Sequence, residues 1–123
     1  MQSPSVSVIV PIYKTERFIK RCLQSLFEQT LSDIEYIFVN DCTPDKSMEI
    51  LSEVLNTSYS HKKPQVKIVS HDKNRGASVA RNSGLSAATG QYVIFADSDD
   101  WVNKQAYEQV LNTLRRFVYG KDT

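Results

Sequence analysis

Short apolar runs alternate along this chain with segments in which apolar residues recur at every third or fourth position. Four runs rich in β-branched residues predict buried strands, over residues 6–13, 34–40, 66–70 and 92–96. Helical spacing follows each run and predicts four helices, over residues 18–27, 48–55, 77–88 and 106–118. Thr15 and Asp45 stand where a side chain would cap the first two helices, and Gly90 stands where the third would end.

The order of these elements predicts the fold class. Strands that alternate with helices form right-handed β–α–β units, so we expect an α/β protein with a mainly parallel sheet and helices on both faces. Ligands of such sheets bind beyond the carboxyl ends of the strands, where the strand order reverses. Candidate chemistry is therefore expected directly after each strand, in residues 11–14, 41–45, 71–76 and 97–101.

Composition narrows the class of protein without naming its function. The 123 residues suffice for one domain, residues 1–123, and the 41% hydrophobic and 24% charged content is ordinary for a globular protein. A net charge of +1 gives no electrostatic case for nucleic acid, and no apolar run approaches the roughly 18 residues of a membrane span. No signal peptide is evident and two cysteines make no disulfide framework, so a cytoplasmic protein is expected.

Carboxylates crowd together in the segment "FADSDDW", directly after the last predicted strand. Asp97, Asp99 and Asp100 would repel one another when ionised, unless a cation lay among them. Mg²⁺ takes one or two protein carboxylates and completes its coordination with water and substrate phosphates, and Mn²⁺ suits similar ligands. From the pattern alone, a site for Mn²⁺ or Mg²⁺ and a solvated turn that caps the next helix explain the segment equally well.

Other positions after strands could meet a nucleotide. Asp41 could accept a hydrogen bond from a base N–H, or serve only in the turn after the second strand. Tyr13 could stack on a planar base, although packing at the rim is the commoner role of such an aromatic. Lys73, Arg75 and Arg81 surround the expected start of the third helix, where they could attract an anion or form an ordinary solvated basic loop.

The two histidines, His61 and His71, lie in or beside expected loops. Neither has a cysteine or a second histidine at the spacing of a metal site, so the sequence assigns them no role.

Two long stretches carry a resemblance to a known family. Residues 6–47, with "VSVIVPIY" and "FVNDCTPDKS", and residues 74–101, with "NRGASVARNSG" and "YVIFADSDDW", are similar in order to the motifs of the inverting family 2 glycosyltransferases of the GT-A fold. The resemblance covers nearly the whole chain and is far more specific than any motif within it. It implies a nucleotide-sugar donor, a divalent metal, and transfer of the sugar to an acceptor hydroxyl.

The resemblance also implies which residues hold the nucleotide. Pro11 and Tyr13 would line the base pocket, with the Tyr13 ring against the base. Asp41 would accept from the base N–H, most simply that of uracil, so a UDP-sugar is the expected donor. Asn74 and Arg81 would contact the nucleotide portion.

The carboxylate segment would then meet the sugar and the diphosphate. Asp97 would touch the ribose or the donor sugar, with Ser98 beside it in the nucleotide-sugar site. Asp99 would hold Mn²⁺ or Mg²⁺ on the diphosphate, and Asp100 would be an acid just outside the metal's own ligands. A cation there removes the repulsion among the carboxylates and neutralises charge on the departing nucleoside diphosphate.

The chain departs from the family pattern in places that bear on function. Lys14 stands where the family usually has Asn, and Cys42 and Thr43 stand where it usually has Gly and Ser. Family catalytic domains also continue well past the metal motif, into a half that supplies the acceptor site and the general base. Of the acids here, Asp100, Glu108 and Asp122 have no counterpart as that base. The chain is therefore expected to be the donor-binding N-terminal half of a catalytic domain, truncated after one further helix.

These interpretations lead to expectations about partners and place. The enzyme would add a sugar to a carbohydrate or a lipid-linked glycan, in polysaccharide or glycoconjugate synthesis. It would work in the cytoplasm or peripherally at the inner face of a membrane. Apolar surface near the fourth strand and the last helix would favour self-association. Nucleotide-sugar binding without transferase activity is the alternative that keeps every motif.

Two other enzyme classes share parts of the pattern. A phosphatase of the haloacid dehalogenase type needs its nucleophilic Asp after the first strand, whereas here "PIY" ends that strand and D-x-D comes last. A nucleotidyltransferase would want a glycine-rich phosphate loop after the first strand, and "PIYKTE" is not one. Both are therefore weaker interpretations than a glycosyltransferase.

Overall fold

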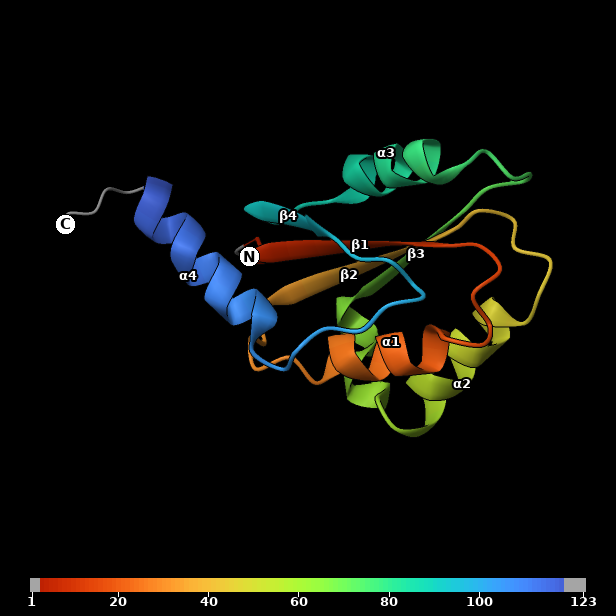
Figure 1. Ribbon diagram of the computed structural model, residues 1–123, viewed down its shortest axis with the longest axis horizontal. Coiled ribbons are helices and arrows are strands. Elements are labelled where there is room, and N and C mark those ends of the chain that lie inside the picture. Colours follow the sequence, from red (N-terminus) through yellow and green to blue (C-terminus); the bar gives the residue numbers. More distant parts are fainter. Residues whose placement is uncertain (1–2, 119–123) are drawn as a thin grey trace.

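Parallel strands form the centre of the computed structural model, which describes residues 3–118. They are β1 (Val6–Ile12), β2 (Ile34–Asn40), β3 (Val66–Ser70) and β4 (Tyr92–Phe95), in the order β3-β2-β1-β4. Each pairs in parallel with its neighbour, with Val6 of β1 opposite Ile34 on one side and Tyr92 on the other. The chain builds outward from β1 to β3 and then returns to the other side of β1, so the strand order reverses between β1 and β4 (Figure 1).

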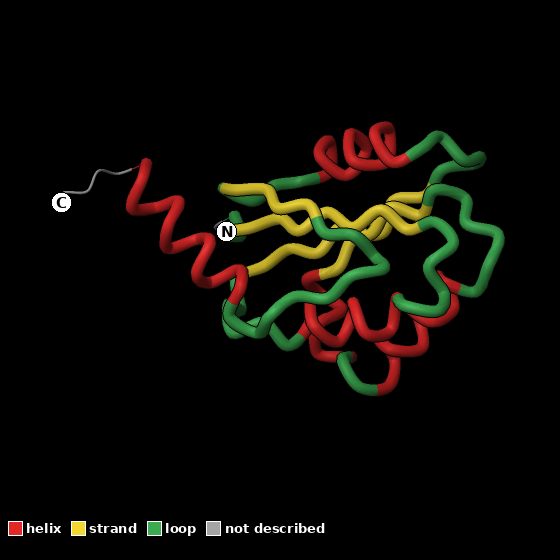
Figure 2. Tube along the Cα trace, viewed as in Figure 1, coloured by secondary structure: helices red, strands yellow, loops and turns green. Residues whose placement is uncertain are grey.

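Helices cover both faces of the sheet, as the sequence predicts. Figure 1 shows α1 (Ile19–Phe27) and α2 (Ser47–Thr57) on one face and α3 (Ala77–Ala87) on the other. A short 3₁₀ helix, η1 (Ser60–Gln65), precedes β3 within a segment expected to be a plain loop. The last helix, α4 (Ala106–Val118), lies at the amino ends of the strands, away from the loops at their carboxyl ends (Figure 2).

Burial on both faces explains why the strands are apolar runs instead of alternating patterns. Along β1, Val8 and Val10 belong to the larger core under α1 and α2, whereas Ile9 belongs to the smaller core under α3. The smaller core includes Ala80 of α3, a residue whose size lets the helix lie close to the sheet.

Two glycines allow α3, and the segment that connects it to β4, to lie close to β1. A Cβ on Gly84 would lie 2.4 Å from Cγ2 of Ile9, and a Cβ on Gly90 would lie 2.6 Å from the backbone nitrogen of Ser7. Because such distances are far below normal contact, only glycine permits this approach. The prediction that Gly90 ends the helix is wrong, since α3 ends at Ala87 and Ala88 is already extended.

The two predicted caps have different outcomes. The prediction that the Thr15 side chain caps α1 is wrong, because its hydroxyl accepts a hydrogen bond from Ser98 and its carbonyl accepts from the N–H of Ile19. Asp45 does accept from the N–H of Ser47, the first residue of α2. Burial alone would raise the pKa of Asp45, but hydrogen bonds from Thr43 and Ser47 lower it to about 2.

The end of the described chain packs at the amino ends of the strands. In α4, Tyr107 and Leu111 are buried against the larger core. Apolar side chains are nevertheless exposed near β4 and α4, among them Phe95, Trp101 and Phe117. Self-association through this surface stays a prediction. Within residues 3–118 no helix combines the length and apolar character needed to cross a membrane.

Candidate functional site

A cleft of about 500 Å³ opens beyond the carboxyl ends of β1, β2 and β4, at the place where the strand order reverses. Its lining brings together all the residues that the sequence assigns to the nucleotide sugar and the metal: Pro11, Tyr13, Asp41, Asn74, Arg81, Asp97, Ser98 and Asp99. These residues come from four separate segments of the chain, so only the fold makes them neighbours.

The end of β1 supplies one wall of the cleft. Pro11 has no backbone N–H to donate. It lies beyond Ile9, the last residue of β1 that pairs with β4, so the pairing with β4 loses no hydrogen bond. Tyr13 follows the strand and is 38% exposed, which places it at the rim and not in the core. The Lys14 ammonium lies over the Tyr13 ring, 5.4 Å from its centroid. A half-exposed ring at a cleft mouth is available for stacking.

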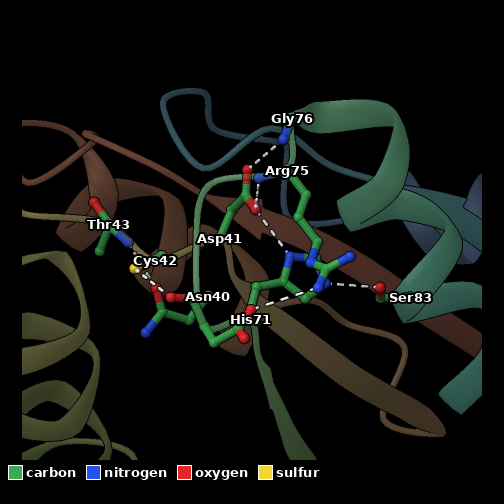
Figure 3. Close-up of polar contacts among 9 residues, drawn as sticks. Asn40, Asp41, Cys42, Thr43, His71, Arg75, Gly76 and Ser83 are labelled. Atoms are coloured by element: carbon green, nitrogen blue, oxygen red, sulfur yellow. Dashed lines mark hydrogen bonds and ion pairs between the residues drawn. The ribbon is translucent and has the colours of Figure 1, made fainter.

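Asp41 is the most firmly held side chain of the cleft (Figure 3). It is only 3% exposed, and its Oδ1 accepts from Nδ1 of His71 and from the N–H of Arg75, each at 2.8 Å. Its Oδ2 accepts from the N–H of Gly76 at 2.9 Å. Burial alone would raise the pKa of Asp41, but these hydrogen bonds and the charge of His71 hold the pKa below its ordinary value. Asp41 is therefore an anion in the folded protein.

The same contacts change the interpretation of the basic loop. Gly76 is the cap residue of α3, with a φ of 94° that suits glycine, and its N–H points at Asp41. The negative charge that this helix start stabilises is thus a side chain of the protein itself. Arg75 pairs with Asp72 at 3.5 Å on the surface, and it does not line the cleft. The N–H groups of Arg75 and Gly76 are thus used by Asp41, and binding of an anion by the rest of this helix start stays a prediction.

Arg81 faces the cleft from α3 and meets the loop after β4. Its guanidinium lies 3.6 Å from Oδ1 of Asp97, and both side chains are substantially exposed, at 41% and 64%. Exposed ion pairs contribute at most about 1 kcal/mol, so a ligand with a phosphate could readily replace Asp97 as the partner of Arg81.

The loop after β4, which carries the carboxylates, is fixed by hydrogen bonds to Thr15 and Cys22. Ser98 is buried and its hydroxyl donates to that of Thr15 at 2.9 Å, while the thiol of Cys22 donates to the carbonyl of Asp97 at 3.5 Å. Burial, followed by nearby carboxylates, raises the pKa of the Cys22 thiol to about 12, so it stays protonated. The role of Ser98 toward the nucleotide sugar stays a prediction, since here its hydroxyl is bonded to Thr15.

The neighbouring carboxylates of this loop point to different places. Asp99 lines the cleft, and its carboxylate makes no hydrogen bond or ion pair with the described part of the chain. Asp100 instead accepts from the N–H of Trp101 and lines an adjoining hollow with Cys22 and Tyr107. Asp99 and Asp100 thus line different hollows, and Asp97 lines both.

Two of the residues that depart from the family pattern, Lys14 and Cys42, fall on unusual backbone. Among residues 3–118, Lys14 with φ 56° and Cys42 with φ 57° are the non-glycine residues with positive φ. This left-handed region favours glycine and tolerates asparagine. The Gly and Asn of the family pattern at these positions therefore have a backbone reason. The two turns also touch, because the N–H of Lys14 donates to the hydroxyl of Thr43 at 2.8 Å.

Comparison with known proteins decides the family. The model of "Glycosyl transferase family 2" matches residues 7–120. The chain belongs to this family.

Relatives of this family agree along most of the chain. The chain is 45% identical over 107 residues to the "Uncharacterized glycosyltransferase EpsJ" of Bacillus subtilis, covering 87% of this chain and 29% of EpsJ. It is 40% identical over 108 residues to the "Minor teichoic acid biosynthesis protein GgaB" of the same organism, covering 86% of this chain and 11% of GgaB. The chain thus spans less than a third of either relative.

A solved structure confirms the GT-A fold. TarS of S. aureus in complex with UDP superposes with a TM-score of 0.79 at 30% identity, over 91% of this chain and 32% of the TarS chain. TarS has also been solved in complex with UDP-GlcNAc. The predicted fold class and family are therefore confirmed, and the chain spans about a third of the TarS chain that it matches.

Family 2 enzymes of the GT-A fold commonly use a divalent metal, and the cleft can be tested for one. Residues 3–118 contain no cluster of three or more His, Cys, Asp or Glu side chains that could hold an ion by themselves. The exposed carboxylates of Asp97 and Asp99 are hard oxygen donors, which suits Mg²⁺ or Mn²⁺ when a diphosphate and water complete the shell. The residues present fit such a metal bound together with its substrate.

The acids considered as a general base do not lie free in the cleft. Glu108 is in α4, where it accepts from the Thr30 hydroxyl at 2.9 Å. Asp100 lines the adjoining hollow. Asp122 lies outside the described residues.

Sequence reasoning missed His71 and Ser83. The ring of His71 joins Asp41 to Ser83 of α3, although it lies 30 residues from the first and 12 from the second. Its place directly after β3, at the edge where the other site residues gather, was the available clue.

Proposed function

We propose that this chain is the donor-binding part of a glycosyltransferase that takes a UDP-sugar with Mn²⁺ or Mg²⁺ and transfers the sugar to an acceptor hydroxyl. The observation that carries the proposal is the single cleft lined by all eight residues assigned to nucleotide sugar and metal. The UDP and UDP-GlcNAc complexes of TarS, at 30% identity, support UDP as the nucleotide.

Different residues of the cleft would meet the base and the diphosphate. Tyr13 would stack on the uracil and Pro11 would line the base pocket, while Asp41 would accept from the ring N–H. Arg81 would exchange Asp97 for a phosphate oxygen, and Asn74 would contact the nucleotide portion.

Asp99, with Asp97 beside it, would hold the metal on the diphosphate. A bound metal supplies Lewis-acid stabilisation of the charge that develops on the leaving UDP. The protein's own contribution is to fix the donor, because positioning alone lowers the barrier to attack on the sugar.

Transfer with inversion also needs a base within hydrogen-bond reach of the acceptor oxygen. Asp97 and Asp99 are committed to donor and metal in this proposal, and Glu108 lies at the opposite end of the sheet. We therefore propose that the 123-residue chain binds the donor and does not transfer sugar at a rate typical of its family. A nucleotide-sugar-binding fragment without transferase activity is the alternative for this chain alone.

A saccharide polymer or a lipid-linked glycan is the proposed acceptor class. The teichoic acid role in the name of GgaB, at 40% identity, supports synthesis of such a surface polymer. A cytoplasmic location, where nucleotide sugars are made, goes with this proposal.

The experiment is calorimetric titration of UDP, CDP, ADP and GDP into the chain in the presence of Mn²⁺. We expect UDP to bind most tightly. Absence of binding by any of the four, or preference for a purine nucleotide, would overturn the proposed donor. Product formation from a labelled UDP-sugar with a panel of acceptors then separates the two forms of the proposal. Robust transfer by this chain would show that its base lies among these residues or comes from a second copy.

A further inference from the structure

His71 is held at both ring nitrogens, and one of them contacts Asp41, which lines the cleft (Figure 3). Its side chain is 8% exposed, Nδ1 lies 2.8 Å from Oδ1 of Asp41, and Nε2 lies 2.8 Å from the hydroxyl of Ser83. Its backbone N–H donates to the carbonyl of Asn40 at 2.9 Å. The ring therefore ties together the end of β2, the end of β3 and the middle of α3.

The contacts decide where one ring proton lies. An ionised carboxylate can only accept, so Nδ1 of His71 must carry a proton toward Asp41. Nε2 faces the Ser83 hydroxyl, which can donate to a neutral ring or accept from a protonated one. In either state, the contact with Ser83 holds the ring in the orientation that aims Nδ1 at Asp41.

The same contacts leave one acceptor position on Asp41. A carboxylate offers about four acceptor positions. The donors His71 and Arg75 use Oδ1, and Gly76 uses one position on Oδ2. One position on Oδ2 is left for a ligand, and Asp41 lines the cleft. An anionic acceptor of this kind suits the N3–H of uracil and opposes the unprotonated N3 of cytosine.

We propose that His71 is a positioning residue that gives the site its selectivity for uracil over cytosine, by holding Asp41 as an oriented anion through a hydrogen-bonded chain that ends at Ser83. The inference rests on the proposed function and goes beyond it. If the Nδ1–H donor were lost, Asp41 could take up a proton and donate to the cytosine N3, so that CDP would be accepted.

The test compares UDP with CDP, because the two nucleotides differ only at this edge of the base. Their affinities are measured by calorimetry with Mn²⁺ for the unmodified chain, His71→Leu, His71→Asn and Ser83→Ala. We expect a preference for UDP of about tenfold or more, equal to about 1.4 kcal/mol, in the unmodified chain. His71→Leu should lose most of this preference. His71→Asn should keep most of it, since its amide nitrogen can replace Nδ1.

Controls separate selectivity from folding. His61→Leu changes the other histidine, on η1 and away from the cleft, and should leave the UDP to CDP ratio unchanged. Ser83→Ala should reduce the ratio by less than His71→Leu. Thermal unfolding of each variant shows whether it is folded.

Different results overturn different claims. If His71→Leu folds and keeps the ratio of the unmodified chain, the inference is overturned and the proposed function stands. If the unmodified chain binds neither nucleotide, the proposed function fails and the inference fails with it. If His71→Leu does not fold, ¹⁵N NMR of histidine-labelled, unmodified chain decides: Nδ1 of His71 should be protonated, and an unprotonated Nδ1 would overturn the inference.

Discussion

The Asp41 carboxylate accepts a hydrogen bond from the backbone N–H of Gly76, 2.9 Å away, at the start of α3. A helix start attracts negative charge, and here the protein supplies that charge from the end of β2. In the proposed function Asp41 faces the base, whereas a bound diphosphate would meet Arg81 directly and Asp99 through a metal. Base recognition and phosphate binding would then be tasks of different residues.

Tyr13→Ala should weaken UDP binding and leave folding nearly unchanged. The ring is 38% exposed at the rim of the cleft, so its removal opens no core cavity. Base–aromatic stacking contributes about 1–3 kcal/mol in single-stranded nucleic acid complexes, which gives the expected upper range. Calorimetry and thermal unfolding measure the two effects. Phe18→Ala, an exposed aromatic outside the cleft, is the control and should leave affinity unchanged. A large fall in melting temperature with unaltered affinity would place Tyr13 in the core instead.

Glu35 should make stability depend on pH at the acidic end. It lies in β2 and accepts from Lys67, Thr89 and Ser7. Burial alone would raise the pKa of Glu35, but these contacts lower it from 4.5 to about 2. Because the folded-state pKa is depressed, the stabilisation is present above about pH 4.5 and is lost as pH falls toward 2.

Glu35→Gln tests this network. At pH 7 the variant should lose about 1.5–3 kcal/mol of unfolding free energy, as expected for hydrogen bonds to a charged group. Between pH 5 and pH 2 its stability should fall less than that of the unmodified chain. Glu53→Gln makes the same chemical change on the exposed side of α2 and serves as the control. Parallel pH curves for Glu35→Gln and the unmodified chain would contradict the account.

Two buried tyrosines should respond in different ways to loss of the hydroxyl. Tyr36 donates to the carbonyl of Leu26 at 2.7 Å, whereas the buried hydroxyl of Tyr107 has no hydrogen-bond partner among residues 3–118. Tyr36→Phe should therefore cost about 1 kcal/mol of stability, and Tyr107→Phe should cost nothing or stabilise slightly. Urea unfolding of both variants is the measurement. An equal loss in both would show that the Tyr107 hydroxyl has a partner.

Lys14→Asn should stabilise the protein. Lys14 has φ 56°, and the left-handed region costs most residues about 1–2 kcal/mol but is tolerated by Asn. A gain of about 0.5–1 kcal/mol is therefore expected in the same unfolding experiment. Lys73→Asn is the matched control, because it removes the same charge from an exposed loop residue whose φ is not positive. If both substitutions shift stability equally, the effect is one of charge and not of backbone conformation.

Much of the fold follows from local pattern. The predicted strand over 6–13 ends one residue earlier, at Ile12, and the predicted helix over 77–88 ends at Ala87. Apolar runs and helical spacing suffice for this because both faces of the sheet are covered. The rule that ligands bind beyond the carboxyl ends of parallel strands then located the cleft residues, including Asp41 and Asp99.

The features that the sequence did not reveal depend on long-range contacts or backbone angles. The hydroxyl of Thr15 is engaged by Ser98, 83 residues away, and this is why it does not cap α1. The donors to Asp41 come from the loop between β3 and α3, and no spacing rule predicts them. The positive φ of Cys42 is equally hidden, since its residue type disfavours that conformation.

The most direct test of the central claim is calorimetric titration of UDP into the chain with Mn²⁺, repeated in excess EDTA and with Asp99→Ala. Asp100→Ala is the matched variant, because its carboxylate lies outside the cleft. We predict clear binding of UDP with Mn²⁺. The affinity should fall at least about tenfold, equal to about 1.4 kcal/mol, in EDTA or with Asp99→Ala. Asp100→Ala should bind UDP nearly as well as the unmodified chain. Binding of equal strength in EDTA and with Asp99→Ala would contradict the central claim.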